Sequence, residues 1–192
     1  RAFGDQKGFD VVVVPPKQIE LPTGQSLRVS STMIRYMLES GHVAEAATAL
    51  LRPYRLAGPV VSGWGRGRKL GFPTLNMGRP DQIIPAEAVY AGFVELADSQ
   101  EALQQKTERC PAVFSIGEAR TFGDEHPLLI EAHLLDRTLP DMTGHWMAMD
   151  FTCRLRHQHK FGSPEALVKQ IQADCRQARA LLRELPEGDG HD

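Results

Sequence analysis

The spacing of hydrophobic residues changes along the chain and separates an N-terminal part from the rest. Val11–Val14 form a continuous β-branched run that Pro15-Pro16 end, a pattern typical of a short strand buried on both faces in a parallel sheet. A turn is expected at residues 21–25. Helical spacing then begins at the hydroxyl side chains of Ser30–Thr32, which can cap a helix that Gly41 ends. With a second, alanine-rich helix expected at Val43–Leu51, this order predicts an α/β segment.

From Tyr54 onward the pattern changes to short apolar segments that alternate with turn residues, which is typical of an antiparallel barrel or sandwich. Along one of these segments, period-two alternation puts Glu131 and His133 on one face and Ala132 and Leu134 on the other. The expected strands cover Leu56–Val61, Val89–Leu96, Ala112–Ile116, Leu128–Leu135 and Trp146–Leu155.

The last element is predicted to be a helix that packs its apolar side on these strands. Ser163 is placed to cap its N-terminus, and Pro164 occupies the first helical position, where the missing N–H has no cost. The sequence from Pro186 onward is expected to be a loose tail. The apolar stripe of the helix consists of Leu167, Ile171, Cys175, Ala178 and Leu182.

Composition limits the classes of function. The chain has 24 acidic and 22 basic residues and a net charge of −2, so no broad basic field is available to hold a nucleic acid. Three cysteines without a CxxC pair argue against a disulfide framework and favour a cytoplasmic location. No run approaches the roughly 18 apolar residues that span a bilayer. The first residues match neither a signal peptide nor a natural start, so we expect the chain to begin within a longer protein. Its oligomeric state is left open.

A glycine-rich, basic stretch carries the clearest chemical signal. Glycine backbone can turn its N–H groups toward an anion, and the basic side chains add positive charge. Thr74 and Asn76 follow directly, and in an extended segment their oxygens face the same way, as a Mg²⁺ site requires. The stretch is neither a P-loop nor a dinucleotide fingerprint, so a mobile surface loop is an open alternative. Its residues of interest are Gly63, Gly65, Arg66, Gly67, Arg68, Lys69 and Gly71.

The run from Gly63 to Asn76, GWGRGRKLGFPTLN, resembles the GxGRGxxLGxPTxN motif of the riboflavin kinase family. The resemblance covers about residues 52–182 in the family's order, and it implies a mainly β fold. That fold is a six-stranded antiparallel Greek-key barrel with a C-terminal helix. The further matches are Ser115-Ile116-Gly117 with Thr121-Phe122-Gly123 (NIGxxPTFG), Ile130–Asp136 (xExHLLD), Leu155-Arg156 with Lys160-Phe161 (LRxExKF), and SxExLxxQIxxD in the last helix.

This resemblance implies a reaction that uses ATP and Mg²⁺ to phosphorylate the 5′-hydroxyl of riboflavin, giving FMN. In the implied site Glu131 is the general base, Thr74 and Asn76 hold Mg²⁺, and Arg156 and Phe161 contact the flavin. The residues implied in ATP binding are Gly63, Gly65, Arg66, Gly67, Lys69, Gly71, Thr74 and His133.

The upstream part carries a second resemblance. Residues 28–35, RVSSTMIR, resemble the ISSTxIR motif that closes the adenylyltransferase domain of bacterial bifunctional riboflavin kinase/FMN adenylyltransferases. The nucleotide-binding HxGH of that domain is absent from this chain, so the upstream part is expected to be inert by itself. We therefore expect an α/β remnant of a nucleotidyltransferase domain at residues 1–51, a riboflavin kinase domain at residues 52–186 and a flexible tail at residues 187–192.

Several of these residues also have simpler interpretations. Without its motif, Glu131 is an ordinary exposed strand carboxylate, and His133 is a structural partner rather than a catalyst. Trp64 beside basic residues is weak support for nucleic-acid binding. A zinc site is not expected, because no thiolate or HExxH accompanies the histidines His145, His157 and His159.

Departures from the family pattern lead to an alternative function. Ser115 stands for an asparagine, Thr143 for the tyrosine of a DLYGK segment and Gln158 for an acidic residue, while Ala119-Arg120 replaces Arg-Pro. The alternative is a catalytically degenerate barrel that binds flavin or nucleotide without transferring phosphate. A third possibility, an OB-like nucleic-acid binder, requires salt-dependent affinity and is opposed by the net charge.

Overall fold

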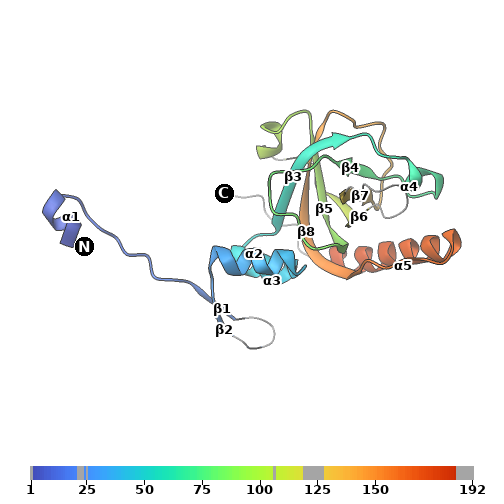
Figure 1. The fold of residues 1–192 in the computed structure, drawn as a ribbon. Coiled ribbons are helices and arrows are strands. Elements are labelled where there is room, and N and C mark those ends of the chain that lie inside the picture. The colour runs from blue at the N-terminus through green and yellow to red at the C-terminus, as the bar shows by residue number, and fades with distance from the viewer. Residues whose placement is uncertain (1, 21–23, 25, 106, 119–127, 185–192) are drawn as a thin grey trace.

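The structure is a computed structural model that describes residues 2–20, 24, 26–105, 107–118 and 128–184 (Figure 1). The expected tail at residues 187–192, most of the expected turn at residues 21–25, and the motif residues Thr121-Phe122-Gly123 lie outside the described residues. No helix in the described part of the chain is long and apolar enough to cross a membrane.

Within the described residues, six antiparallel strands close into a barrel in the order β3-β4-β7-β6-β5-β8. Closure removes the exposed sheet edges that would otherwise invite aggregation. The predicted barrel is thus confirmed, and each expected strand is present with bounds shifted by a few residues. The strand β4 was not predicted as a separate strand. The strands are β3 (Tyr54–Val61), β4 (Leu75–Met77), β5 (Ala88–Ala97), β6 (Cys110–Glu118), β7 (Leu128–Leu134) and β8 (Trp146–His157).

Aromatic rings fill the barrel interior. Tyr90, Phe114 and Phe151 are fully buried, and the Phe151 ring meets the other two edge to face at centroid distances of 5.2 and 5.0 Å. Such edge contacts align the positive rim of one ring with the negative face of the next. These residues come from β5, β6 and β8, so the core joins strands that are distant in sequence.

Helix α5 (Pro164–Arg183) covers the outside of the barrel, as predicted. The Ser163 hydroxyl accepts a hydrogen bond of 3.2 Å from the Ala166 N–H, which satisfies one of the unpaired donors of the first turn. Cys175, Ala178 and Leu182 pack on outward-facing Val89 and other residues of the strands. Burying a large aliphatic side chain such as leucine contributes about 1.5–3 kcal/mol, so this stripe anchors the helix.

Helices α2 (Ser31–Glu39) and α3 (Val43–Leu50) pack on each other, and α3 packs on β3 and β8 of the barrel. Their residues Leu38 and Val43 belong to the same buried cluster as the aromatic core. The expected cap is present, because the Ser30 hydroxyl accepts from the Met33 N–H at 3.2 Å. Arg154 on β8 donates to the Ser40 carbonyl oxygen at 2.9 Å and so fastens the end of α2 to the barrel.

The prediction of a buried strand at Val11–Val14 is wrong. These residues are extended and have no strand partner among the described residues, and Val12 and Val14 are 84% and 83% exposed. A β-branched run becomes a buried strand when neighbouring strands and helices cover both of its faces. Here the run lies apart from the barrel (Figure 1), between α1 (Ala2–Lys7) and a small antiparallel pair, β1 (Gln18–Glu20) and β2 (Ser26–Arg28).

Candidate active site

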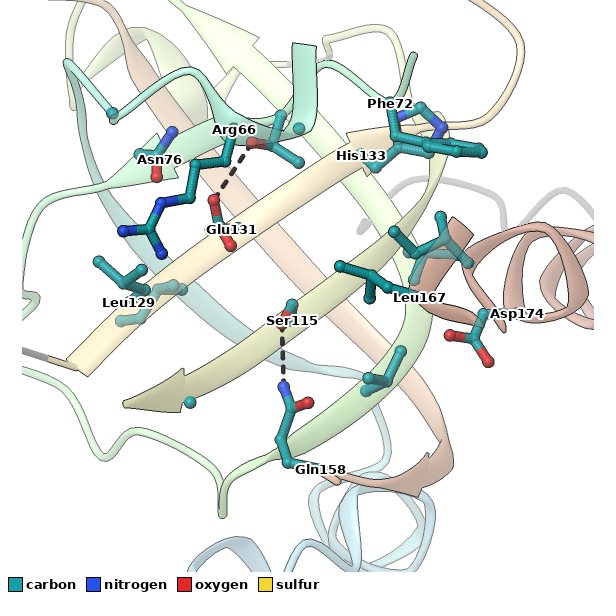
Figure 2. A pocket seen from close by; sticks show the side chains of 18 of the residues that line it. Arg66, Phe72, Asn76, Ser115, Leu129, Glu131, His133, Gln158, Leu167 and Asp174 are labelled. Atoms are coloured by element: carbon teal, nitrogen blue, oxygen red, sulfur yellow. Dashed lines mark hydrogen bonds between the residues drawn. The ribbon is translucent and has the colours of Figure 1, made fainter. Parts of the chain in front are cut away.

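The pairing of β4 with β7 brings together residues that are far apart in the sequence. Asn76 is the cross-strand partner of Glu131, and Leu75 is that of Ala132. At the start of β4 the Thr74 hydroxyl donates a hydrogen bond of 3.3 Å to Glu131 Oε1 (Figure 2). Because the threonine proton points to the carboxylate, the lone pairs of Thr74 Oγ1 remain available to a cation. The predicted trio of Thr74, Asn76 and Glu131 therefore occupies one site.

The Glu131 carboxyl group is largely withdrawn from solvent, and this burial raises its pKa above the ordinary value. Two neighbours oppose the effect: the Thr74 hydroxyl bonds to the carboxylate, and the Arg66 guanidinium favours its negative form. Figure 2 shows the Arg66 side chain reaching over Glu131 from the glycine-rich segment. A carboxyl group whose pKa is raised toward neutrality is a stronger proton acceptor than an exposed one.

The glycine-rich segment is a single helical turn rather than an open loop. Helix α4 (Arg66–Lys69) begins after Gly65, whose φ of 67° is a left-handed conformation that glycine adopts without strain. Gly71 at φ 86° ends the turn, and the Phe72 N–H donates to the Gly67 carbonyl oxygen at 2.8 Å. This turn places Arg66 above Glu131.

Gly63, just after the end of β3, lies against the Asn76 side chain. A Cβ at Gly63 would lie 2.6 Å from the Asn76 Cγ, well inside the closest real contact. Gly63 thus leaves the space that the Asn76 amide fills. The chain at the end of β3 consequently lies directly against this candidate metal ligand.

His133 stabilises the segment that carries the threonine. Its ring Nδ1 lies 2.8 Å from the Pro73 carbonyl oxygen. A carbonyl oxygen can only accept, so Nδ1 is the donor in this contact. The ring also meets Phe72 edge to face at 5.4 Å (Figure 2). The alternation predicted for β7 is confirmed, because Ala132 and Leu134 are buried on the opposite face.

Two cavities formed by described residues meet at this site. The larger, of about 920 Å³, extends from the glycine-rich turn to α5, and the smaller, of about 220 Å³, lies between that turn and residues 137–143. Thr74 and Asn76 line both. The residues predicted from the sequence that line the larger cavity are Gly63, Arg66, Gly67, Thr74, Asn76, Glu131, His133, Arg156 and Phe161; those lining the smaller are Gly63, Gly65, Thr74 and Asn76.

Lys69 and Gly71 line neither of these two cavities, and Lys69 is exposed. Their role in ATP binding stays a prediction. The smaller cavity is instead lined by two basic side chains: Arg68, which belongs to the glycine-rich stretch, and Arg137, which the sequence did not single out. Arg137 is held by a two-pronged bond to Glu108 with distances of 2.8 and 2.9 Å. Thr143, which stands where the family has a tyrosine, also lines this cavity.

The α5 end of the larger cavity contains a buried ion pair. Arg156 donates to Asp174 on α5 from Nε and Nη2 at 2.9–3.1 Å, and the Arg156 guanidinium carbon lies 5.7 Å from the centre of the Phe161 ring. Asp174 is 3% exposed and also accepts from Gln170 at 2.8 Å. Gln170 and Asp174 both belong to the SxExLxxQIxxD match, but their partnership with Arg156 depends on how α5 docks.

The chemistry of the site fits a magnesium ion that shares its ligands with phosphate. Thr74 and Asn76 supply a hydroxyl and an amide oxygen, which are hard donors of the kind that Mg²⁺ prefers, and the Glu131 carboxylate lies beside them. In the described residues no group of three or more His, Cys, Asp and Glu side chains could enclose a metal. A Mg²⁺ ion here would therefore complete its coordination with substrate and water oxygens.

Comparison with known proteins decides the family. The family model for riboflavin kinase (Flavokinase) matches residues 50–182, which include every residue of the site. The chain belongs to the riboflavin kinase family. Among curated relatives, a bifunctional riboflavin kinase/FMN adenylyltransferase from Pseudomonas fluorescens is 33% identical over 178 residues, which cover 93% of this chain and 52% of that protein. The chain thus spans about half the length of the curated relatives it matches.

Solved structures of similar proteins support the riboflavin kinase fold. A riboflavin kinase from Trypanosoma brucei has a TM-score of 0.50 and 25% identity, and the match covers 69% of this chain and 81% of that one. A structure described as a macrolide-efflux protein from Streptococcus pneumoniae has a TM-score of 0.71 and 32% identity, covering 91% of this chain and 54% of that one. The barrel with its C-terminal helix is therefore the fold of a riboflavin kinase domain.

Proposed function

We propose that this chain transfers the γ-phosphoryl group of ATP to the 5′-hydroxyl of riboflavin and so produces FMN and ADP. The observation that carries the proposal is the hydrogen bond between Thr74 and Glu131 at the meeting point of the two cavities. A base, two cation ligands and space for two substrates are what a direct phosphoryl transfer requires. Family membership supplies the identity of the substrates.

In this proposal Glu131 accepts the proton of the 5′-hydroxyl as that oxygen forms its bond to the γ-phosphorus. The bond between the γ-phosphorus and the β,γ-bridging oxygen breaks, and ADP leaves with that electron pair. Thr74 and Asn76 would hold a magnesium ion, whose chemistry when bound would be to neutralise phosphate charge. Arg66 lies close enough to influence the Glu131 carboxylate, so it can also stabilise charge on the transferred group.

The two substrates are assigned to different parts of the site. The nucleotide lies along the glycine-rich turn, with its γ-phosphate at Thr74 and Asn76 and with Arg68 and Arg137 nearby. The flavin occupies the larger cavity, whose α5 end offers the apolar and aromatic surface that a planar ring requires. That surface is formed by Phe161, Leu167 and Ile171, beside Arg156.

The test is ATP-dependent formation of FMN by the purified chain with Mg²⁺, followed by chromatography. General-base assistance is worth about 10²–10⁴-fold, so Glu131→Ala is expected to lower turnover by about 10²-fold or more. Asn76→Ala is expected to lower it by tens of fold and to raise the Mg²⁺ requirement. Glu20→Gln is the matched control, because this strand carboxylate lies outside both cavities. Unchanged turnover in Glu131→Ala would remove the assigned base.

A second candidate is a barrel that binds flavin or nucleotide without transferring phosphate. The departures Thr143 and Gln158 favour it, because each lines one of the cavities. Calorimetry combined with the turnover assay separates the two functions: tight binding of riboflavin without FMN formation selects the binding role.

We also propose the division into a nucleotidyltransferase remnant at residues 1–51, a kinase domain at residues 52–186 and a tail at residues 187–192. The relatives' double name and a similarity that extends beyond residues 50–182 support it. Cys110, Cys153 and Cys175 are free thiols, which agrees with a cytoplasmic location. An adenylyltransferase activity of a longer protein would be tested by FAD formation from FMN and ATP.

A further inference from the structure

Gln158 and Ser115 both depart from the family pattern, both line the larger cavity and are hydrogen-bonded to each other. Gln158 Nε2 donates to Ser115 Oγ at 2.9 Å and to the Ile116 carbonyl oxygen at 3.1 Å (Figure 2). Gly117 leaves the room for this contact, because a Cβ there would lie 3.2 Å from the same nitrogen. The two side chains thus form a neutral pair that joins β6 to the chain just after β8.

The bonds within this pair decide what it can offer a ligand. Both amide hydrogens of Gln158 are used, so its remaining polar atom is the acceptor Oε1. Ser115 Oγ accepts from Gln158, so the serine hydroxyl can donate its own proton. An acceptor and a donor therefore stand side by side, and neither is charged. A glutamate at position 158 could not form this arrangement, because a carboxylate has no proton for the Ile116 carbonyl oxygen.

The pair lies between the reacting end and the apolar end of the cavity. Ser115 is the cross-strand partner of Glu131, and neighbouring strands lie about 5 Å apart. Gln158 follows Arg156, whose ion pair with Asp174 marks the α5 end. Figure 2 shows Gln158 reaching up to Ser115, with Glu131 on one side of Ser115 and Leu167 and Asp174 on the other.

We infer that Ser115 and Gln158 recognise a hydroxyl group of the ribityl chain of riboflavin. The inference rests on the proposed function, which puts the 5′-hydroxyl at Glu131 and the ring near α5. The polyol must then pass along the cavity between these two ends, where Ser115 and Gln158 line it. A ligand hydroxyl both donates and accepts, so it can donate to Gln158 Oε1 while accepting from the Ser115 hydroxyl.

The pair therefore acts on substrate choice rather than on the chemical step. A neutral hydrogen bond contributes about 0.5–1.5 kcal/mol, which corresponds to a preference of about 2- to 10-fold. A flavin that lacks the matching hydroxyl leaves a donor and an acceptor unpaired inside the cavity and is discriminated against for that reason.

The experiment measures dissociation constants of the full chain, with ADP and Mg²⁺, for riboflavin and for its 2′-, 3′- and 4′-deoxy analogues. Quenching of flavin fluorescence reports binding. At least one analogue is expected to bind about 2- to 10-fold more weakly than riboflavin. This ratio is expected to fall close to unity in Ser115→Ala and in Gln158→Leu, with little change in affinity for the analogue. Gln82→Leu is the matched control, because its amide also bridges two backbone groups but lies outside both cavities.

Gly117→Ala provides a second perturbation that keeps both side chains and displaces the Gln158 amide. It is expected to lower the same ratio. The inference is overturned if the wild-type chain treats all analogues like riboflavin, or if the variants weaken every ligand equally while the ratio persists. Its failure differs from failure of the proposed function, which would appear as no FMN formation from riboflavin by the wild-type chain.

Discussion

The His133 ring and the Pro73 carbonyl oxygen are joined by a hydrogen bond of 2.8 Å, which connects β7 to the residue before Thr74. Removing the ring in His133→Ala frees the segment that positions the threonine. We expect kcat/KM to fall about 2- to 10-fold, the worth of one neutral hydrogen bond, and the half-saturating Mg²⁺ concentration to rise.

His133→Asn is the variant to compare with His133→Ala, because an asparagine amide can donate a hydrogen bond from nearly the same position as Nδ1. It is expected to restore most of the Mg²⁺ affinity. If both variants need the same raised Mg²⁺ concentration, the bond to Pro73 is not what positions Thr74.

The acid limb of the pH profile should depend on Arg66. Glu131 works as a base when it is deprotonated, and burial raises its pKa, so kcat/KM falls as the pH drops through a value above that of an ordinary glutamate. Arg66 opposes the shift, so Arg66→Met is expected to move the acid limb to higher pH. Arg66→Lys keeps the positive charge and should leave its midpoint nearly in place. If Arg66→Met and Arg66→Lys have the same acid-limb midpoint, the charge of Arg66 does not influence the pKa of Glu131.

Glu131 is expected to cost the folded protein stability. Its pKa is raised on folding, so the ionised carboxylate is disfavoured in the folded state, and this loss is present at pH 7. Glu131→Gln removes the charge and keeps an oxygen for the Thr74 hydroxyl. We expect its Tm at pH 7 to rise by about 2–4 °C for each kcal/mol relieved, while turnover falls by about 10²-fold or more.

The predicted increase in Tm of Glu131→Gln is checked by measuring it as a function of pH. Below the ordinary pKa of glutamate, the wild-type carboxyl group is protonated in both the folded and the unfolded chain. The difference in Tm between the two proteins should therefore vanish there. A difference that is independent of pH would point to packing rather than to the buried charge.

Gly63→Ala should disturb the candidate metal ligand Asn76 without replacing it. The added methyl group would overlap the Asn76 amide, with Cγ 2.6 Å away. Misplacing a catalytic group by about 1 Å can cost about 10²-fold, so we expect a loss of that order together with weaker Mg²⁺ activation. The same change at Gly162, where nothing lies within 4 Å of the added carbon, serves as the control. Equal effects at both positions would exclude a specific clash with Asn76.

Local signals made parts of this fold predictable. Ser30 and Ser163 cap α2 and α5 through hydrogen bonds to residues three positions later, so the nearby sequence specifies them. The same reasoning failed at Val11–Val14, because a hydrophobic run indicates burial but cannot supply the strands that bury it. β4 was missed for a related reason: it has three residues, and its pairing with β7 is not visible locally.

In the site, too, some features were predictable from the sequence and others depend on tertiary contacts. The motif match singled out Thr74, Asn76 and Glu131, and the structure brings them together across 57 positions of sequence separation between Thr74 and Glu131. The contacts that complete the cavity could not be foreseen, because they depend on tertiary docking. The Arg156–Asp174 pair needs α5 in place, and the Gln158–Ser115 pair needs the chain after β8 to return over β6.

Thr74 and Asn76 form a wall shared by both cavities, and this has a consequence for the course of the proposed reaction. ATP, the phosphoryl donor, and riboflavin, the phosphoryl acceptor, reach these residues from different cavities and can be bound at the same time. Neither substrate has to leave before the other binds. The phosphorus then passes between them in a single displacement without a phosphorylated enzyme, and its configuration inverts. The kinetics would be those of a ternary complex rather than ping-pong.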